Sequence, residues 1–301
     1  MIAVKAVVSL CSHLTREIGE VEPSEYEIPD DNKVLVATPN YTNLFSSEVH
    51  TNHVECGEVW GRGGIDYNWT IVGRSFVHFA RTRLCQLAVS GGFTHLFWLD
   101  DDAIIDPMIL PKFLAHDKDV VIAPYPMRKM PHAIGILSST CGDFRDHDSY
   151  KNMEVKDLNQ GLIQVDGGGT HCMLVKTATF LKKGPVADCL SEDEEPEELT
   201  FQEEDDKGLH YFIMPKSGTE DMLWCYRAKC KDIEVWCDTD VFANHVGFSP
   251  VITREWCDYV ADSEEMKDMD WENSKLRIIP GSENYRNLEG GVRADRAANL
   301  V

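Results

Sequence analysis

Apolar runs alternate with segments of helical periodicity along most of this chain. Runs of roughly four to eight apolar residues, bounded by turn-forming residues, are typical of buried strands. Five such runs are predicted to be strands, at residues 33–37, 93–99, 119–123, 172–175 and 233–237.

Helices are expected between several of these runs. Segment 74–90 repeats apolar residues at near-helical spacing and is followed by two glycines that would end the helix. The pair Asp106-Pro107 resembles a helix start, with proline in the first helical position, and this helix would run to about residue 115 with a distortion at Pro111. Further helices are predicted at 177–181 and 220–231.

This alternation predicts an α/β fold with a mostly parallel central sheet. The cluster Thr38-Pro39-Asn40 should end the first strand, and segments 41–73 and 141–159 look irregular. We expect a single domain over residues 1–262, with its core at 33–250, followed by a C-terminal extension at 263–301. Residues 1–10 are interpreted as a strand of this fold and not as a signal peptide.

Composition adds few constraints on the fold but several on the function. The 301-residue chain has no apolar run long enough to cross a membrane, so we expect no membrane insertion. None of its ten cysteines forms a Cys-x-x-Cys pair, which argues against a zinc site. Several of them lie inside apolar stretches, as free buried cysteines do, which favours a reducing, cytoplasmic location.

The formal net charge is −22, and residues 192–206 hold ten acids and no base. Because like charges repel and stay solvated, the segment 191–207 is predicted to be a mobile surface loop. The rest of the chain is acidic as well, which disfavours general affinity for nucleic acid.

Three consecutive acids, Asp100, Asp101 and Asp102, follow directly after the apolar run at residues 93–99. Like charges at the end of a buried strand are costly, and a divalent cation would offset that cost. Open α/β sheets bind ligands just outside the carboxyl ends of their strands. The acids therefore suggest a Mg²⁺ or Mn²⁺ site, although a solvated acidic turn is the alternative.

Five segments occur in a recognisable order: ARTRLCQLAVSGGFTHLFWLDDDAIIDP, VIAPYPMRK, QVDGGGTHCMLVKTATF, GTEDMLWCYRAKC and VWCDTDVFANHVG. Together they resemble the inverting, nucleotide-sugar-dependent glycosyltransferases of the GT-A fold, in the broad family-two-like group. The resemblance covers roughly residues 33–250. It implies a Rossmann-like domain that binds a nucleotide sugar. Small transferases of this kind also occur in bacteriophages.

The resemblance implies a role for several residues at the nucleotide. Thr38, Pro39 and Asn40 match the loop that holds the base and ribose. Arg81 matches a basic residue near the nucleotide, with a solvated helix charge as the alternative.

The acids of the strand end take the family's Asp-x-Asp positions. Asp102 would ligate the metal, and Asp100 would contact the ribose or the metal. Because three acids stand where the family has two, Asp101 is also a candidate contact to the nucleotide sugar. His245 matches a third metal ligand, and an imidazole favours Mn²⁺ over Mg²⁺; a purely structural histidine is the alternative.

The resemblance also places the reaction chemistry. Asp221 matches the general base that takes the proton of the acceptor hydroxyl, with Glu220 beside it. A capping box from Ser217 to Glu220 is the structural alternative for this acid pair. The resemblance further makes Asp166 a contact to sugar hydroxyls. The three glycines that follow it, Gly167, Gly168 and Gly169, would let the backbone approach the sugar or be a flexible turn.

The expected function is therefore metal-dependent transfer of a sugar, with inversion, from a UDP-sugar such as UDP-glucose to an acceptor hydroxyl. Sugar-1-phosphate nucleotidyltransferases are a second class, but they need a glycine-rich phosphate loop where this chain has Thr38-Pro39-Asn40. A non-catalytic nucleotide-sugar-binding module is a third. The acceptor could be a polysaccharide, a glycolipid, a protein or a hydroxymethylated pyrimidine in phage DNA. Phosphate contacts to DNA could come from Arg128, Lys129, Arg145, Lys182 and Lys183.

Overall fold

The computed structural model describes residues 31–128, 132–143, 146–181, 203–205, 208–214, 218–246 and 251–262, and the account below concerns these. The expected N-terminal strand at 1–10 and the C-terminal extension at 263–301 lie outside the described residues. Most of the acidic segment does so too.

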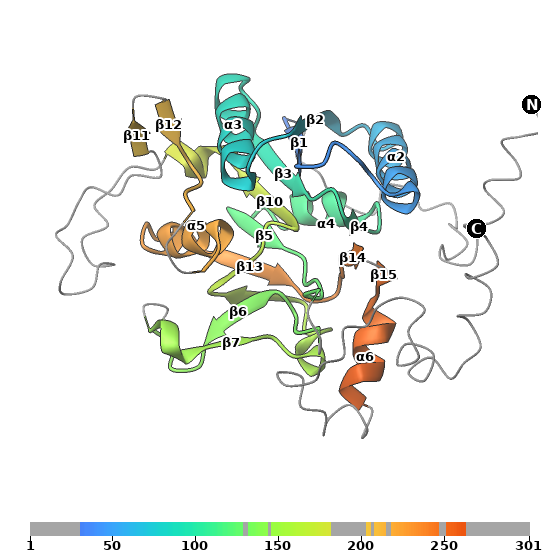
Figure 1. Ribbon diagram of the computed structural model, residues 1–301, viewed down its shortest axis with the longest axis vertical. Helices are drawn as coiled ribbons and strands as arrows, with labels where there is room; N and C mark the ends of the chain where they lie inside the picture. The colour runs from blue at the N-terminus through green and yellow to red at the C-terminus, as the bar shows by residue number, and fades with distance from the viewer. Residues whose placement is uncertain are drawn as a thin grey trace, which may run out of the picture.

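A seven-stranded sheet forms the centre of the molecule, in the order β2-β1-β3-β10-β5-β13-β8 (Figure 1). Five of its strands point the same way and two, β10 and β8, run against their neighbours. The predicted α/β class with a mostly parallel central sheet is confirmed. The strands are β1 (Lys33–Asn40), β2 (Asp66–Gly73), β3 (His95–Leu99), β5 (Val120–Ile122), β8 (Leu162–Val165), β10 (Cys172–Lys176) and β13 (Val235–Asp238).

Helices cover both faces of this sheet, and the side chains of β3 show how. Leu96 and Trp98 join one core cluster, whereas Phe97 and Leu99 join the other, as the two-residue period of a strand requires. Residues of α3 (Val77–Ser90) and α5 (Glu220–Lys229) pack into the first cluster, and residues of α2 (Ser47–Arg62) and α4 (Ile109–Ala115) into the second. Burial on both faces explains why the strand sequences are apolar throughout.

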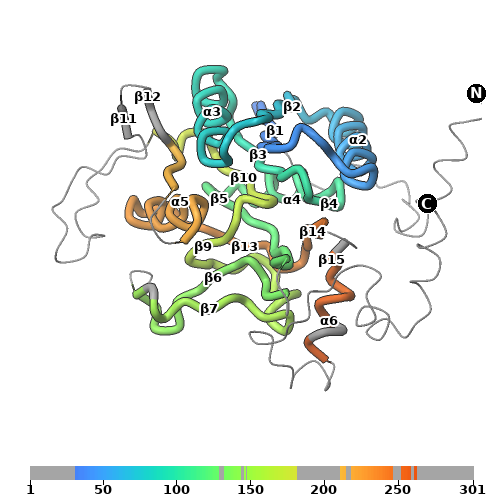
Figure 2. The backbone as a smooth tube through the Cα atoms, in the orientation of Figure 1, coloured from blue at the N-terminus to red at the C-terminus, as the bar shows by residue number. Residues whose placement is uncertain are grey.

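Small sheets extend the fold beyond this layer. One joins β4 (Ala103–Ile104), β14 (Asn244–Val246) and β15 (Val251–Ile252), and another joins β6 (Ile136–Ser139), β7 (Tyr150–Asn152) and β9 (Gly167–Gly168). Figure 2 shows β6 and β7 on the far side of β13 from the β1–β3 region. A last helix, α6 (Arg254–Asp262), ends the described chain, and short 3-10 turns lie at His147–Ser149, Val155–Asp157 and Thr177–Leu181.

Segment 41–73 is not irregular, because it contains both α2 and β2. The helix buries few apolar residues, and the Ser46 hydroxyl caps it by accepting a hydrogen bond from the Val49 N–H at 3.2 Å. Strand β2 lies at an edge of the sheet and stays half-exposed, so it lacks a run of buried apolar residues. The pattern of buried apolar residues was therefore too weak in both elements to predict them.

Thr38-Pro39-Asn40 does not end the first strand either, since β1 continues through Asn40 in register with Gly73 of β2. Pairing of β1 with β3 stops at Ala37, opposite Trp98. Proline has no N–H to donate, so a strand tolerates it where no neighbouring strand requires that hydrogen bond. Pro39 lies in such a position, beyond the last pair with β3.

Two more predicted loops contain strands. Segment 141–159 holds β7, and within the acidic segment Glu203–Asp205 (β11) pairs with Gly208–His210 (β12). Seven cysteines of the described chain are free and six of those are buried, as expected of small hydrophobic residues, but Cys230 is disulfide-bonded. No helix in the described parts of the chain is both long and apolar enough to span a bilayer.

Candidate functional site

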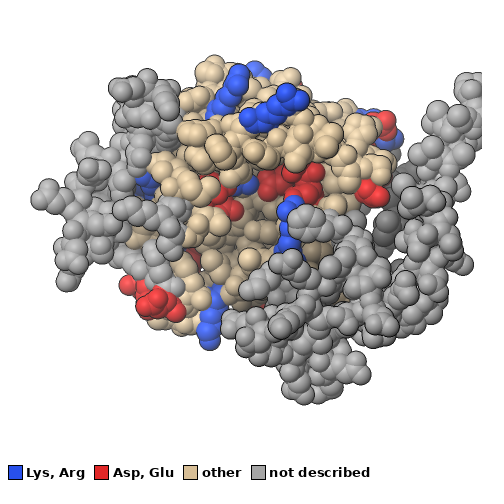
Figure 3. Space-filling view, viewed as in Figure 1, with Lys and Arg blue, Asp and Glu red and all other residues tan. Residues whose placement is uncertain are grey.

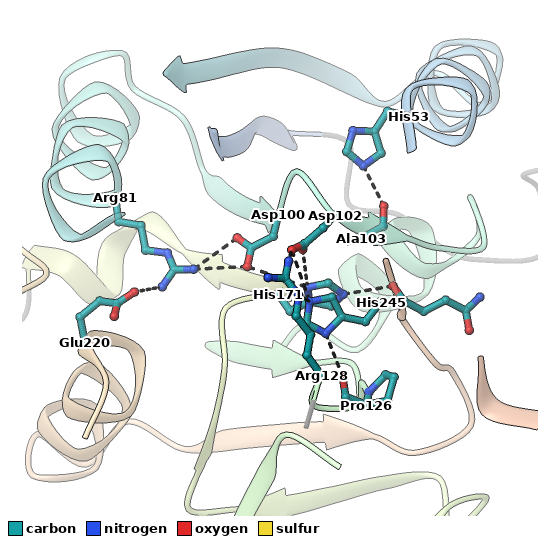
Figure 4. A network of polar contacts seen from close by, with 11 residues as sticks. His53, Arg81, Asp100, Asp102, Ala103, Pro126, Arg128, His171, Glu220 and His245 are labelled. Atoms are coloured by element: carbon teal, nitrogen blue, oxygen red, sulfur yellow. Dashed lines mark hydrogen bonds and ion pairs between the residues drawn. The ribbon is translucent and has the colours of Figure 1, made fainter. Parts of the chain in front are cut away.

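Strand pairing brings residues far apart in the sequence to the carboxyl end of β3. Strand β10 runs antiparallel to β3 with Cys172 opposite Leu99, so His171 lies across from Asp100, whose N–H donates to the His171 carbonyl at 3.1 Å. Strand β14 pairs with β4 so that His245 stands opposite Ala103. The result is a cluster of acidic and imidazole side chains beside a hollow, where acidic groups gather in the space-filling view (Figures 3 and 4).

Asp102, His171 and His245 present one ligand atom each, and these three atoms lie within 4.8 Å of one another. The Nδ1 atom of His171 is 3.4 Å from one Asp102 oxygen, and the Nε2 atom of His245 is 3.3 Å from the other. One carboxylate and two imidazoles form a donor set that suits Mn²⁺, Fe²⁺ or Zn²⁺ better than Mg²⁺.

Backbone carbonyls orient both imidazole rings toward Asp102. The Pro126 carbonyl lies 2.9 Å from Nδ1 of His245, and the Asn244 carbonyl lies 3.2 Å from Nε2 of His171. Because a carbonyl only accepts, each of these nitrogens carries the proton, and the other nitrogen turns its lone pair toward the carboxylate. Burial lowers the pKa of His245 to about 3 and lowers that of His171 as well, so both rings are neutral. The imidazole lone pairs and the carboxylate are all electron donors that face one another, so a cation can bind between them.

Arg128 supplies a positive charge at this cluster. Its side chain forms an ion pair with Asp102, and its Nε–H donates to Nε2 of His245 at 3.0 Å. Of the five cations considered as phosphate contacts, Arg128 is therefore already paired. The other four, Lys129, Arg145, Lys182 and Lys183, lie outside the described residues.

The Asp100 carboxylate interacts with Arg81, although it was expected to bind the metal. Arg81 donates to both of its carboxylate oxygens at 3.3 Å, and Oδ2 of Asp100 lies 3.9 Å from Nδ1 of His171. The structure thus groups Asp102 and His245, as expected, with His171. A metal-binding role for Asp100 stays a prediction. Sequence reasoning missed His171, whose one signal is its place just before an apolar strand.

Arg81 joins the acidic strand end to α5. Its side chain is only 5% exposed and pairs with both Asp100 and Glu220. Burial opposes the charge of the guanidinium, but the neighbouring acids outweigh it and raise its pKa above the ordinary value. The alternative of a solvated helix charge is therefore wrong.

The two acids at the start of α5 have different surroundings. Burial raises the pKa of Glu220 even though Arg81 pairs with it. Asp221 accepts hydrogen bonds through one oxygen, Oδ1, from the Thr219 hydroxyl and from the Met222 N–H at 2.8 Å. Thr219 is the N-cap of the helix, without a side-chain capping bond. The proposed cap Ser217 lies outside the described residues, and the helix begins too late for it.

The glycines after Asp166 are explained by close packing within the protein. A Cβ on Gly169 would lie 2.0 Å from the Tyr125 hydroxyl and 3.1 Å from Oδ2 of Asp221. A Cβ on Gly167 would lie 2.9 Å from Met222, and one on Gly168 would lie 2.8 Å from Ile136. Gly169 therefore lets Tyr125 and Asp221 come together at the site, whereas contact of the glycines with a sugar stays a prediction.

The remaining expected contacts are engaged by other protein groups. Thr38 is buried and its hydroxyl accepts from the Trp69 indole at 3.0 Å, while the Asn40 amide donates to the Leu44 carbonyl at 3.1 Å. Asp166 pairs with Lys229 and accepts from the Ser139 N–H at 2.6 Å. These three side chains hold the strand ends in place, and their binding to a nucleotide sugar stays a prediction.

Asp101 lies between the other two acids of the trio, and its pKa is shifted. Burial, and then the neighbouring Asp100 carboxylate, raise the pKa of Asp101 to about 6. Positive charge placed near the cluster would lower it again. Its expected contact with the nucleotide sugar stays a prediction.

No family model matches the chain, and no curated protein is similar to it in sequence. Among solved structures it is similar to A197 from STIV, with 16% identity, a TM-score of 0.43, and coverage of 71% of this chain and 85% of that one. It is also similar to apo UDP-glucose pyrophosphorylase, with 6% identity, a TM-score of 0.32, and coverage of 71% and 76%. Both likenesses are too low to carry an argument about function.

Proposed function

We propose that this protein is a metal-dependent glycosyltransferase of the GT-A type. It would move a sugar from a nucleotide sugar, most simply a UDP-sugar, to an acceptor hydroxyl with inversion at the anomeric carbon. The observation that supports this most is the cluster of Asp102, His171 and His245 at the carboxyl end of β3. Ligands of open α/β sheets bind at that edge.

The metal would be held by Asp102 and the two histidines, with the carbonyls behind the rings fixing their lone pairs. When bound, a divalent ion such as Mn²⁺ would act as a Lewis acid on the departing diphosphate. The two imidazoles favour Mn²⁺ over Mg²⁺ for this position.

Asp221 is the better of the two acids to serve as general base. Glu220 is occupied by Arg81, whereas Asp221 uses only Oδ1 for its hydrogen bonds to Thr219 and Met222. Its Oδ2 lies beside Gly169 and Tyr125. That oxygen can take the proton of an acceptor hydroxyl as the hydroxyl attacks the anomeric carbon.

A donor screen tests this proposal. Purified protein is incubated with a panel of nucleotide sugars and Mn²⁺, and release of the nucleoside diphosphate is measured. We expect turnover with at least one UDP-sugar, and a loss of at least about a hundredfold in Asp221→Asn and Asp102→Asn. Asp66→Asn, which changes an exposed acid on β2, should keep full activity.

The outcomes separate the competing classes. Formation of a nucleotide sugar from UTP and a sugar 1-phosphate would replace the proposal with a nucleotidyltransferase. Binding without turnover for every donor would replace it with a binding module. Acceptors are screened by mass shift and include saccharides, lipids, proteins and DNA containing hydroxymethylcytosine; transfer to DNA should fall steeply with added salt.

A further inference from the structure

Arg128 occupies the position between Asp102 and His245 where a cation would bind. Its guanidinium pairs with Oδ2 of Asp102 and donates to Nε2 of His245, and these two acceptor atoms are only 3.3 Å apart (Figure 4). A guanidinium only donates hydrogen bonds and is always charged. Arg128 therefore provides the positive charge that two facing acceptors need.

The same acceptor atoms cannot serve Arg128 and a metal together. Nε2 of His245 has a single lone pair, because its partner nitrogen Nδ1 donates to the Pro126 carbonyl at 2.9 Å. That lone pair accepts from Arg128 at 3.0 Å. A metal bound to Nε2 must break this hydrogen bond.

We propose that Arg128 is an internal counter-ion, which a divalent metal displaces from Asp102 and His245 and which then binds the diphosphate of the donor. This inference rests on the proposed function. It gives Arg128 two positions: against Asp102 and His245 in the metal-free protein, and against the diphosphate when metal and donor are bound.

Arg128 is the part of this cluster that can move. Its side chain is 47% exposed, whereas those of His171 and His245 are 3% and 12% exposed. Within the described parts of the chain, its polar contacts are those to Asp102 and His245. The histidines are also tied to backbone carbonyls, so the metal would displace the arginine and leave the rings in place.

The freed guanidinium suits the donor. Its planar array of N–H groups matches the oxygens of a phosphate and can contact two at once. Without a metal, the acids at residues 100–102 would repel a diphosphate. When a divalent ion replaces Arg128, the positive charge beside the acids increases. The released guanidinium is then available to the diphosphate. The metal should therefore bind first and the nucleotide second.

Metal titration tests the exchange without relying on turnover. Free Mn²⁺ is followed by its EPR signal in wild type, Arg128→Gln, and the matched control Arg62→Gln, which changes an exposed arginine at the end of α2. Removing the competing side chain should tighten Mn²⁺ binding about tenfold in Arg128→Gln. Affinity for UDP at saturating Mn²⁺ should fall by about tenfold in the same variant, and the control should match wild type in both measurements.

Each result decides the proposal. If wild type binds Mn²⁺ and Arg128→Gln binds it equally or more weakly, with an unchanged circular dichroism spectrum, Arg128 is not a displaced counter-ion and the proposed function still stands. Unchanged UDP affinity in Arg128→Gln would show that Arg128 does not bind the diphosphate. If wild type does not bind Mn²⁺ at all, the metal site fails and this inference fails with it.

Discussion

At the scale of single residues, the polar side chains at the strand end divide into two sets. Arg81 pairs with both Asp100 and Glu220, which links the start of α5 to the end of β3. Asp102, His171 and His245 point their acceptor atoms at one another in an arrangement that could hold a metal ion, and Arg128 supplies the positive charge there. We therefore propose a positioning role for the first set and a metal-binding role for the second.

His53 gives a pH-dependent prediction at the same scale. It is 5% exposed, and burial lowers its pKa to about 4. The unfolded chain binds a proton near pH 6.5, the ordinary value, but the folded chain does not until about pH 4. Its contribution to the free energy of unfolding is therefore complete above about pH 6.5 and declines as the pH falls to 4, by up to about 3 kcal/mol.

Urea unfolding at a series of pH values measures this contribution. Replacing His53 with Gln keeps an amide donor for the Ala103 carbonyl, which lies 3.1 Å from Nε2 of the histidine. Stability of this variant should decline less steeply than that of wild type between pH 6.5 and 4. His50→Gln, which changes an exposed histidine of the same helix, should follow wild type; equal slopes for all three proteins would refute the assignment.

At the scale of secondary structure, the site depends on strand register. His171 reaches the cluster because β10 pairs with β3, and His245 does so because β14 pairs with β4. A sequence identifies apolar strands but does not say which of them pair or in which direction. This is why Asp102 could be proposed from its own strand, whereas His171 required the antiparallel pairing of β10.

The link between α4 and β13 is a second prediction at this scale. Asp238 is fully buried at the end of β13 and accepts from Lys112, within α4, at 3.0 Å and from His116, the C-cap of that helix, at 2.8 Å. Burial opposes its charge, but these hydrogen bonds lower its pKa below the ordinary value. Asp238→Asn should reduce the free energy of unfolding by about 2 to 4 kcal/mol, because it removes the buried carboxylate that pairs with the Lys112 ammonium.

Chemical denaturation at neutral pH measures this loss. The matched control is Asp240→Asn, since Asp240 lies 3.8 Å from the same lysine and is 48% exposed. Exposed pairs of this kind contribute about 1 kcal/mol or less. A cost for Asp238→Asn no larger than that of the control would show that the buried pair does not stabilise the fold.

At the scale of the whole molecule, buried apolar strands were the most predictable feature. The five strands predicted at residues 33–37, 93–99, 119–123, 172–175 and 233–237 all exist, because burial on both faces makes their sequences apolar. Edge strand β2 and the polar helix α2 were missed, since neither depends on a continuous apolar run. The boundary between a domain at 1–262 and a tail at 263–301 stays a prediction.

The candidate site was predictable only in part, for a similar reason. Asp102, His245 and Asp221 stand out in their own segments, but Thr38, Asn40 and Asp166 look equally available in the sequence. In the fold their side chains are engaged by Trp69, Leu44 and Lys229. Which polar groups remain free for a ligand is decided by tertiary contacts, which a single sequence does not display.

Anomalous diffraction from crystals soaked in Mn²⁺ tests the central claim most directly. The account predicts a manganese peak bonded to one oxygen of Asp102, Nδ1 of His171 and Nε2 of His245, with Arg128 moved away from both residues. A peak elsewhere, or no peak with Arg128 still between Asp102 and His245 at saturating Mn²⁺, would contradict it.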